Sequence, residues 1–490
     1  MLFEAFKRNR AERPDAPAFL IASGDRSIPV TWKQFTDDIT AVSWIIEHHS
    51  PGAKIGILGE NSYEWTVVHA ACLFAGAVAL PVDPNLNADE IAKRLSFAGA
   101  SVLLHSSLYA DKAHDVAARI PGLATGSFGS RKTDFFINAA LKALGLLPRT
   151  IWDRASVDVE RTATMVFTSG TTSEPRGVEL PIKALEAFIR STELAVTMTD
   201  EQRSLMLLPL HHIYGICVTY AMLVHGVPMG VCPDFRRIYD AFERFRANFA
   251  FLVPALADIL AAKIELKGKS AEEAFGQPID WIMTGGAPLA RRTYERLTAL
   301  GIKVVSIYGL TETCACYSMT LEGDLPRPCS AGKVSQNPEI ETKVSPEGEL
   351  LIRGPNVMKG YYKMPERTAK AIDPEGWFHT GDRGSIDADG YVWVEGRMSR
   401  TIVLSSGKKI APEEMEDKLV GLPGILEALV SGEGETREIK AEIYASVPED
   451  SVKRTVAALN KTLPVYQRIK TVVVRTEPFP RTSSGKIKLG

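Results

Sequence analysis

The sequence predicts an α/β protein: a large N-terminal domain of α/β sheets with a β-rich subdomain, followed by a small C-terminal α+β domain. Short apolar runs alternate with helical patterns along the first third of the chain, which is typical of a mostly parallel sheet. From about residue 340 this rhythm gives way to short alternating runs between Gly, Pro and Asp turns, and a third pattern begins after Arg397. A chain of 490 residues is also too long for one hydrophobic core, so two or more domains are expected.

Each expected element follows from its local pattern. Buried strands are predicted where a short apolar run ends in a polar or glycine-rich turn, and helices where apolar residues recur with a helical period. The elements expected up to residue 307 are strand 54–58, helix 65–74, strand 77–82, helix 88–97, and strands 101–105, 163–167, 204–208, 249–253, 281–284 and 304–307. Ligands of open α/β sheets collect outside the carboxyl ends of the strands, so we expect the site in the turns that follow.

The C-terminal third predicts a different organisation. Its expected elements are strands 349–353 and 390–395, a hairpin over 401–410, helix 412–419, strand 438–447, helix 452–463 and strand 471–475. We therefore expect an N-terminal domain over 1–396, a hinge at 397–400 and a C-terminal domain over 401–490. Segment 122–148 is the hardest to interpret, because residues 135–147 fit a helix packed on its own domain or an amphipathic helix at a membrane surface.

Composition narrows the class of protein. The net charge of −2 lacks the excess of positive charge that is typical of a nucleic-acid-binding protein. The six cysteines show no C-x-x-C spacing and most lie in apolar surroundings, which indicates reduced thiols. The sequence shows neither a signal peptide nor an apolar run long enough to span a membrane. These features predict a cytoplasmic protein with at most peripheral membrane contact.

Residues 168–178 form the most informative motif. Its glycines allow close backbone approach to a ligand, four hydroxyls (Thr168, Ser169, Thr171, Thr172) supply neutral donors, and Arg176 supplies a cation suited to forked phosphate contacts. The spacing from Gly170 to Gly177 excludes a Walker loop. An isolated stretch of this composition is also compatible with a plain surface loop, but further motifs accompany it.

Four more motifs follow in loops that the strand pattern predicts. They are Thr284-Gly285-Gly286-Ala287-Pro288-Leu289, Tyr308-Gly309-Leu310-Thr311-Glu312-Thr313, Thr380-Gly381-Asp382 and Pro480-Arg481-Thr482-Ser483-Ser484-Gly485-Lys486. In this order and spacing the chain resembles the adenylate-forming superfamily of acyl- and aryl-CoA synthetases, peptide-synthetase adenylation domains and luciferases. Segments 208–215, 353–362, 376–382 and 402–410 resemble bacterial fatty acyl-CoA synthetases in particular.

The resemblance implies binding of ATP and Mg²⁺. It assigns Thr168, Ser169, Gly170, Thr171, Thr172, Arg176 and Gly177 to the phosphates, Gly285, Gly286, Ala287, Tyr308 and Gly309 to the side of the adenine, and Asp382 and Arg397 to the ribose. Glu312 would bind Mg²⁺, with Thr171 completing the shell, since this hard cation prefers oxygen ligands.

The resemblance also implies catalytic roles for Lys486, Glu312, Thr311 and His212. Lys486 would place a charge between the α-phosphate and the reacting carboxylate, and Thr311 would hydrogen-bond the α-phosphate. His212 would form a wall of the acyl pocket near the carboxylate. Taken alone, Lys486 could be a solvated lysine near the end of the chain, His212 an ordinary core histidine, and Asp382 a turn residue.

Four positions depart from the superfamily pattern, and one of them, Cys329 in place of a common glycine ahead of Gly332, is expected to be neutral. Ser173 and Arg176 stand where glycine and lysine are usual, and Arg176 keeps the charge. Ser399 stands where Asp or Lys is common at the hinge. A small residue can still swivel there, so we keep the hinge as an expectation.

The expected function is a two-step ligation. A fatty carboxylate attacks the ATP α-phosphate to give an acyl-adenylate and pyrophosphate, the mobile C-terminal domain then swings, and coenzyme A takes the acyl group. Two alternatives remain open: transfer to an acyl carrier protein, and a non-catalytic nucleotide or acyl-adenylate sensor. The sequence does not determine whether the acid is a medium-chain or long-chain fatty acid or an aromatic acid.

Overall fold

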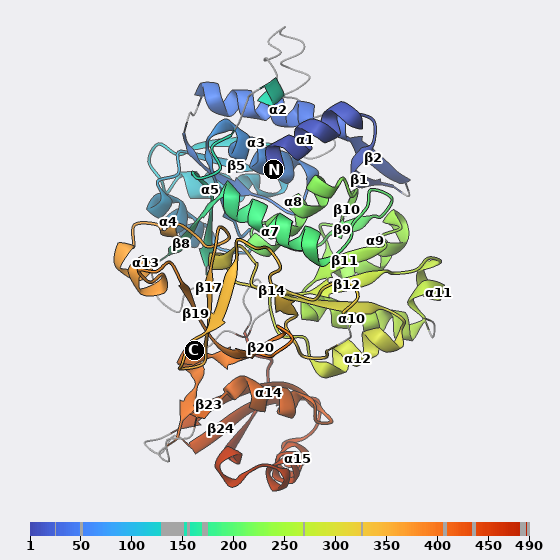
Figure 1. Cartoon of the computed structure of the whole chain (residues 1–490), viewed down its shortest axis with the longest axis vertical. Coiled ribbons are helices and arrows are strands. Elements are labelled where there is room, and N and C mark those ends of the chain that lie inside the picture. The colour runs from blue at the N-terminus through green and yellow to red at the C-terminus, as the bar shows by residue number, and fades with distance from the viewer. Residues whose placement is uncertain are drawn as a thin grey trace.

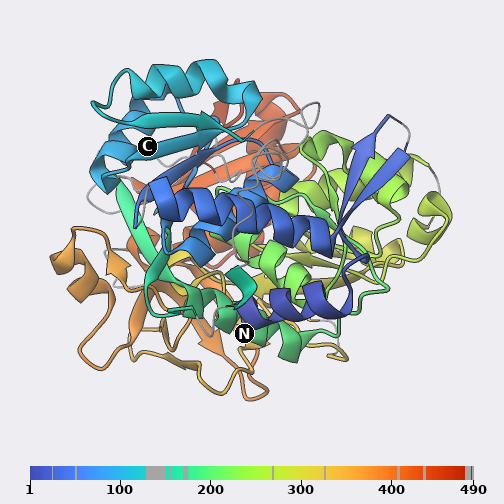
Figure 2. The same cartoon turned by 90° about the horizontal axis from the view of Figure 1, so that it is seen from above.

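The computed structural model describes residues 1–24, 26–49, 52–128, 151–153, 157–168, 175–267, 270–324, 327–404, 409–433, 438–480 and 487. A large N-terminal part carries most of the helices and sheets, and a small C-terminal part lies at one end of its long axis (Figure 1). Seen from above, helices α1 (Leu2–Glu12) and α2 (Trp32–His49) run across the top of the N-terminal part (Figure 2).

A seven-stranded sheet organises the first half of the chain. Its spatial order is β18 (Gly360–Tyr361), β8 (Arg176–Pro181), β7 (Thr162–Thr168), β4 (Val78–Val82), β3 (Lys54–Leu58), β5 (Val102–His105) and β6 (Ala124–Ser127). The five strands from β7 to β6 are parallel, whereas β8 and β18 add antiparallel pairs at one edge. Helices α3 (Tyr63–Ala75), α4 (Ala88–Ala98) and α5 (Ala110–Ala117) connect its parallel strands.

A second sheet has five strands, in the order β11 (Phe249–Leu252), β12 (Trp281–Thr284), β13 (Lys303–Tyr308), β14 (Ser318–Met319) and β15 (Lys333–Val334). Its first three strands are parallel, so the carboxyl ends of β12 and β13 lie at one edge. The helices of this region are α7 (Ile182–Ala195), α8 (Ile213–His225), α9 (Ile238–Phe245), α10 (Pro254–Leu266), α11 (Ala271–Phe275) and α12 (Arg291–Ala299). Between β13 and β14 the chain makes the short 3-10 turn η4 (Thr311–Thr313).

Two four-stranded sheets complete the N-terminal part. One has the order β2 (Arg26–Thr31), β1 (Pro17–Ser23), β10 (Met229–Val231) and β9 (Ser204–Met206). The other is antiparallel, with the order β16 (Glu341–Val344), β17 (Glu349–Arg353), β19 (Phe378–Ile386) and β20 (Val392–Arg397). Helix α13 (Pro365–Ala371) lies between β18 and β19 in sequence.

The C-terminal part has its own apolar core, formed by buried residues between Ile402 and Ile469. The turn η5 (Met398–Arg400) leads into it from β20. Its elements are β21 (Ile402–Val403), β22 (Lys409–Ile410), α14 (Pro412–Val420), β23 (Ile425–Glu433), β24 (Glu438–Ala445), α15 (Glu449–Thr462) and β25 (Ile469–Arg475). Strands β21 and β22 pair as the hairpin that the sequence predicts at 401–410.

The α/β fold class and most of the expected elements are confirmed, and the differences concern sheet membership and strands that the sequence does not predict. The strand expected at 204–208 is shorter and joins the sheet of β1 and β10 rather than that of β11 to β13. Strands β1, β2, β8 and β10 were not expected from the sequence. The helix considered at 135–147 lies outside the described residues.

Candidate active site

The phosphate-loop motif is the connection of a β-hairpin. Thr168 ends β7 and Arg176 begins β8, and the two residues face one another across the antiparallel pair. Within the described chain, Thr168 Oγ1 and Arg176 Nε are buried atoms without a hydrogen-bond partner. A hydroxyl and a guanidinium Nε–H that have no partner among the described residues at the base of one loop form a donor set that fits an anion.

Gly177 has a packing reason to be glycine. A Cβ atom there would come within 2.8 Å of the sulfur of Met165 on the neighbouring strand β7. Residues Ser169, Gly170, Thr171 and Thr172, to which the sequence assigns phosphate or metal contacts, lie outside the described residues.

The end of β12 brings a bare stretch of backbone to the same region. A Cβ atom on buried Gly285 would lie 2.5 Å from Ile307 Cγ2 and 3.2 Å from Tyr214 Cζ, so only glycine fits between β13 and α8. Gly286 has φ +80° and, like Ala287, is exposed. An exposed turn without large side chains suits the flat face of a nucleobase.

The end of β13 carries Tyr308, Gly309, Thr311 and Glu312. Gly309 is required by backbone packing, since a Cβ atom there would lie 2.4 Å from the carbonyl oxygen of Ala315. Thr311 and Glu312 occupy η4, and the carbonyl of Glu312 accepts from the N–H of Met358 at 2.8 Å. The carboxylate of Glu312 accepts a hydrogen bond from the hydroxyl of Tyr361 at 2.9 Å.

Asp382 is a strand residue and not the turn residue that its Gly-Asp context allows. It lies in β19, is 5% exposed, and faces Arg397 across the β19–β20 pair. Its Oδ1 lies 3.0 Å from Arg397 Nε, and its Oδ2 accepts from the hydroxyl of Tyr308 at 2.6 Å. Burial and the adjacent Asp382 carboxylate raise the pKa of Tyr308 well above its ordinary value, so Tyr308 stays a donor.

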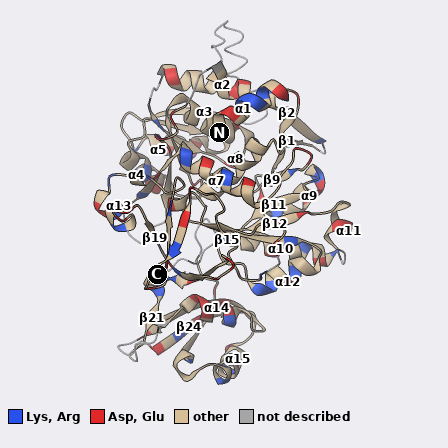
Figure 3. Ribbon diagram, viewed as in Figure 1, with Lys and Arg blue, Asp and Glu red and all other residues tan. Residues whose placement is uncertain are grey.

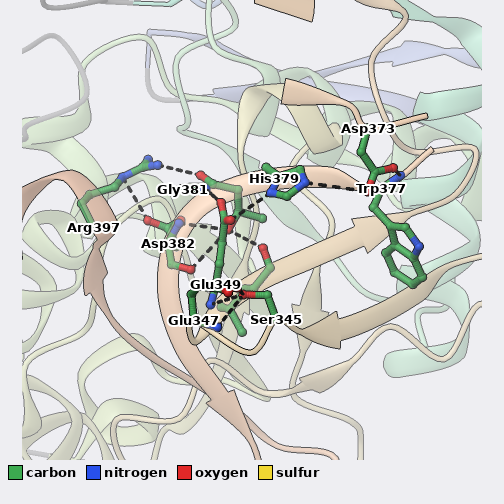
Figure 4. Close-up of polar contacts among 11 residues, drawn as sticks. Ser345, Glu347, Glu349, Asp373, Trp377, His379, Gly381, Asp382 and Arg397 are labelled. Atoms are coloured by element: carbon green, nitrogen blue, oxygen red, sulfur yellow. Dashed lines mark hydrogen bonds and ion pairs between the residues drawn. The ribbon is translucent and has the colours of Figure 1, made fainter. Parts of the chain in front are cut away.

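Glu349 fixes the strand that carries Asp382 (Figure 4). Its Oε1 accepts from the N–H of Gly381 at 2.8 Å, and its Oε2 lies 2.9 Å from Nδ1 of His379. Arg397 donates from Nη1 to the carbonyl of Thr380 at 3.0 Å, beside its contact with Asp382. The Asp382 carboxylate is therefore held in one orientation from both sides of β19.

His212 caps α8 at its N-terminus, beside the carboxyl end of β4. The rings of His211 and His212 lie 4.4 Å apart, and His211 Nε2 lies 3.6 Å from Asp83 Oδ1. Burial, with a smaller contribution from His212, lowers the pKa of His211 to about 3, so this imidazole is neutral near pH 7. Tyr214, the second residue of α8, has a buried hydroxyl that makes no hydrogen bond with the described residues.

Apolar side chains pack in the core behind these residues. Ile213, Cys217, Met283, Cys314 and Cys316 are buried in the large core that also contains the ends of β12 and β13. Cys217 and Cys314 place their sulfur atoms 3.5 Å apart. All six cysteines are free, and five are buried.

Mg²⁺ fits this arrangement when the phosphates supply most of its ligands. Among the described residues there is no group of three or more His, Cys, Asp or Glu side chains that could hold a metal ion. Mg²⁺ commonly binds through one or two carboxylates together with substrate phosphates. Glu312 supplies one such carboxylate at η4, within a contact network that includes the phosphate-loop hairpin.

The structure therefore brings together most of the described residues that the sequence selects. Lys486 lies outside the described residues. Tyr361 was missed as a site residue although it belongs to the quoted segment 353–362, because nothing in the sequence places its hydroxyl against Glu312. A glycine-preceded tyrosine beside an expected strand was the only available signal.

Comparison with known proteins identifies the family. The family model described as AMP-binding enzyme matches residues 6–362, and the model of the AMP-binding enzyme C-terminal domain matches residues 399–489. The chain belongs to the AMP-binding enzyme family, which confirms its resemblance to adenylate-forming enzymes and the expectation of an AMP-forming acid–thiol ligase.

Similar curated proteins cover nearly the whole chain. The long-chain-fatty-acid–CoA ligase FadD13 of Mycobacterium tuberculosis is 26% identical over 452 residues, covering 89% of this chain and 86% of that protein. The 4-coumarate–CoA ligase 2 of Oryza sativa is 27% identical and covers 97% and 89%. The indoleacetate–CoA ligase of Aromatoleum aromaticum is 29% identical and covers 89% and 86%.

Solved structures share the fold. ATP-bound MatB from Rhodopseudomonas palustris superposes with a TM-score of 0.84 at 23% identity, covering 99% of this chain and 97% of that one. The o-succinylbenzoate CoA synthetase of Bacillus subtilis, in complex with its acyl-adenylate intermediate, gives 0.82 at 24% identity and covers 99% and 96%.

Basic and acidic residues are interspersed over the same helices in the view of Figure 3. Among the residues that the structure describes, no helix is long and apolar enough to cross a bilayer.

Proposed function

We propose that this protein activates a carboxylic acid with ATP to an acyl-adenylate and transfers the acyl group to coenzyme A, releasing AMP and pyrophosphate. The observation that carries the proposal is one connected set of contacts. Arg176 at the phosphate-loop hairpin faces Tyr361, Tyr361 binds Glu312, and Tyr308, on the same loop as Glu312, binds Asp382, which pairs with Arg397. In the proposed function, Arg176 at one end of this set supplies a donor for phosphates and Asp382 at the other supplies an acceptor for a ribose.

The proposal gives each site residue a task in the first half-reaction. Arg176 and Thr168 bind the terminal phosphates, the turn of Gly285 to Ala287 accepts the adenine with Tyr308 beside it, and Asp382 accepts from ribose hydroxyls. Thr311 orients the α-phosphate. Mg²⁺, when bound at Glu312, neutralises charge on the leaving pyrophosphate. Lys486 supplies the cation that lets a carboxylate approach an anionic phosphate.

For the second half-reaction we propose that the C-terminal domain turns about residues 397–400. Arg397 is tied to Asp382 in the N-terminal part, whereas Arg400 pairs with Glu413 and Glu416 of α14 at 2.8 and 2.6 Å. Only Met398 and Ser399 separate these anchors, and Ser399 is exposed. This contrast supports a hinge, and the swing would withdraw Lys486 and admit the thiol of coenzyme A.

We propose a medium- or long-chain fatty acid as substrate. The apolar lining around Ile213 and Met283 and the similarity to a long-chain-fatty-acid ligase support this choice. Similar proteins named for coumarate and indoleacetate make aromatic acids the main competing class. The free thiols support a cytoplasmic location, where ATP and coenzyme A would be met.

The direct test is ATP–pyrophosphate exchange with a panel of acids, from acetate to palmitate and with coumarate and indoleacetate. We expect exchange that depends on acid and Mg²⁺, is highest with fatty acids of medium or long chain, and is followed by acyl-CoA formation when coenzyme A is added. Glu312→Gln should lose the exchange because it removes the metal carboxylate but keeps its shape. Exchange with no acid on the panel would reject the enzyme proposal in favour of a nucleotide sensor. Acyl transfer only to an acyl carrier protein would replace coenzyme A as acceptor.

Lys486→Ala should separate the half-reactions. Removal of an electrostatic donor to a transition state typically costs about 10²–10³ in rate, and acyl-adenylate formation should fall by at least that factor. Thioester formation from supplied acyl-adenylate should continue at the wild-type rate, since the swing has already removed Lys486. Lys488→Ala, two residues away, serves as the control with both steps intact. Equal loss of both steps in Lys486→Ala would contradict the two-conformation mechanism.

A further inference from the structure

Tyr361 lies where the phosphate-loop hairpin and the Glu312 turn meet. It belongs to the short strand β18, which pairs antiparallel with β8 through Gly360–Glu179 and Tyr361–Val178. Arg176, the first residue of β8, is thus two residues from the partner of Tyr361. Strand β18 is two residues long and forms one edge of the seven-stranded sheet.

Backbone hydrogen bonds fix the segment around Tyr361 to both neighbours. The N–H of Met358 donates to the carbonyl of Glu312 at 2.8 Å, and the N–H of Tyr362 donates to the carbonyl of Gly177 at 2.9 Å. The N–H of Tyr361 itself donates to Thr368 Oγ1 at 2.9 Å. The position of the Tyr361 side chain is therefore set by the fold before any ligand binds.

The Tyr361 side chain contacts two groups that the proposed function assigns to ATP and Mg²⁺. Its hydroxyl donates to Glu312 Oε1 at 2.9 Å, and its ring faces the Arg176 guanidinium with Cζ 5.5 Å from the ring centre. Burial, together with the Glu312 carboxylate, raises the pKa of the phenol above its ordinary value, so the phenol remains a donor at neutral pH.

We propose that Tyr361 is a positioning residue that sets the Glu312 carboxylate for Mg²⁺ with its hydroxyl and the Arg176 guanidinium for the phosphates with its ring. The inference rests on the proposed function. The hydrogen bond to Oε1 holds the Glu312 carboxylate in one rotamer and leaves Oε2 for a metal ion. The contact with the ring restricts the Arg176 guanidinium, so that it stays near the phosphate loop. The Tyr361 side chain thereby aligns two other side chains from separate parts of the fold, Arg176 of β8 and Glu312 of η4.

Two substitutions separate the hydroxyl from the ring. Tyr361→Phe keeps the ring against Arg176 and removes the hydroxyl, which also interacts with Arg176, so ATP affinity measured by calorimetry in EDTA should fall less than in Tyr361→Leu. The Mg²⁺ concentration that half-saturates binding of Mg–ATP should rise about tenfold, because a hydrogen bond to a charged group is lost. Tyr361→Leu should show the same change and in addition weaken ATP binding in EDTA about threefold, as expected for loss of a cation–π contact.

Tyr362→Phe is the matched control. Tyr362 is the next residue, but its hydroxyl accepts from Lys54 and its ring packs edge-on against Phe97, away from Glu312. Both ATP affinity and Mg²⁺ dependence should stay at wild-type values in this variant. Thermal midpoints of all variants establish that they fold. If Tyr361→Leu does not fold, Tyr361→Phe still tests the role of the hydroxyl.

The outcomes distinguish this inference from the proposed function. A wild-type protein that binds ATP without any effect of Mg²⁺ would contradict the metal role of Glu312 and with it the proposed function. A wild type with clear Mg²⁺ dependence and a Tyr361→Phe variant with the same dependence would overturn the positioning role alone. An equal change in Tyr362→Phe would also overturn it, because the effect would then be a general one of the strand.

Discussion

Asp382 joins three elements through one buried carboxylate. Tyr308 from the end of β13 and Arg397 from the end of β20 both bind it, while Glu349 of β17 holds the strand beneath it. A carboxylate with two fixed partners keeps its orientation, which the proposed contact with a ribose requires. This geometry makes Asp382 a better candidate for ribose binding than its sequence context suggests.

We predict that Asp382→Ala weakens ATP binding by about 1.5–3 kcal/mol, the value of hydrogen bonds to a charged group. Isothermal calorimetry with ATP measures the change, and Asp382→Asn distinguishes loss of charge from loss of shape. Asp389→Ala is the control, because Asp389 is an exposed acidic residue in the turn after β19, paired with Arg327. Unaltered affinity in Asp382→Ala would make Asp382 a purely structural residue.

At the scale of elements, the junction between β20 and α14 decides how the two parts can move. Gly396 has φ +144°, and a Cβ atom there would lie 2.3 Å from Glu413 Oε2, so glycine lets α14 approach the strand. Arg400 is 18% exposed and buried among the acidic residues of α14. The chain is thus anchored on both sides of Met398 and Ser399, and rotation must occur between the anchors.

We predict that Ser399→Pro impairs thioester formation far more than acyl-adenylate formation. Proline fixes φ and restricts the residue before it, so the junction would be held in a narrow range of conformations. Single-turnover kinetics of each half-reaction provide the measurement, and Ser399→Ala should retain both. If the proline variant transfers acyl groups to coenzyme A at the wild-type rate, the hinge is elsewhere.

At the scale of the whole molecule, buried neutral histidines make stability depend on pH. His69 is fully buried, with Nδ1 2.8 Å from the Tyr220 hydroxyl and Nε2 3.1 Å from Thr164 Oγ1. Burial lowers its pKa to about 3. The unfolded chain binds a proton at this residue near pH 6.5 while the folded chain does not, so stability is present above pH 6.5 and is lost as pH falls toward 3.

We predict that lowering the pH from 7.5 to 5.0 reduces the free energy of unfolding by about 2 kcal/mol through protonation of His69 in the unfolded chain alone. His69→Gln should be less stable than the wild type at pH 7.5 but should lose less stability on acidification. Thermal midpoints at the two pH values measure this difference. His48→Gln, on the exposed face of α2, should keep the wild-type pH dependence. A His69→Gln variant with the full wild-type pH dependence would show that another group titrates.

Local patterns predicted the elements well because their causes are local. Strands 54–58, 281–284 and 349–353 match β3, β12 and β17 residue for residue, since each is an apolar run bounded by turns. The strands missed at β1, β8 and β10 contain Pro, Gly or polar residues and are strands because of their neighbours. Asp382 was selected through its motif, whereas Tyr361 was not selected, since its role depends on a contact 49 residues away.

The sequence by itself determined the α/β class, the order of the elements, the family and most residues of the candidate site. These properties follow from periodicity and from motifs whose residues are adjacent in the chain. Only the tertiary structure decided which strands share a sheet, that Asp382 is buried between Tyr308 and Arg397, and that Tyr361 connects Arg176 with Glu312. Those facts depend on the packing of distant segments, which no local pattern encodes, because any polar residue near a strand end could in principle meet several partners.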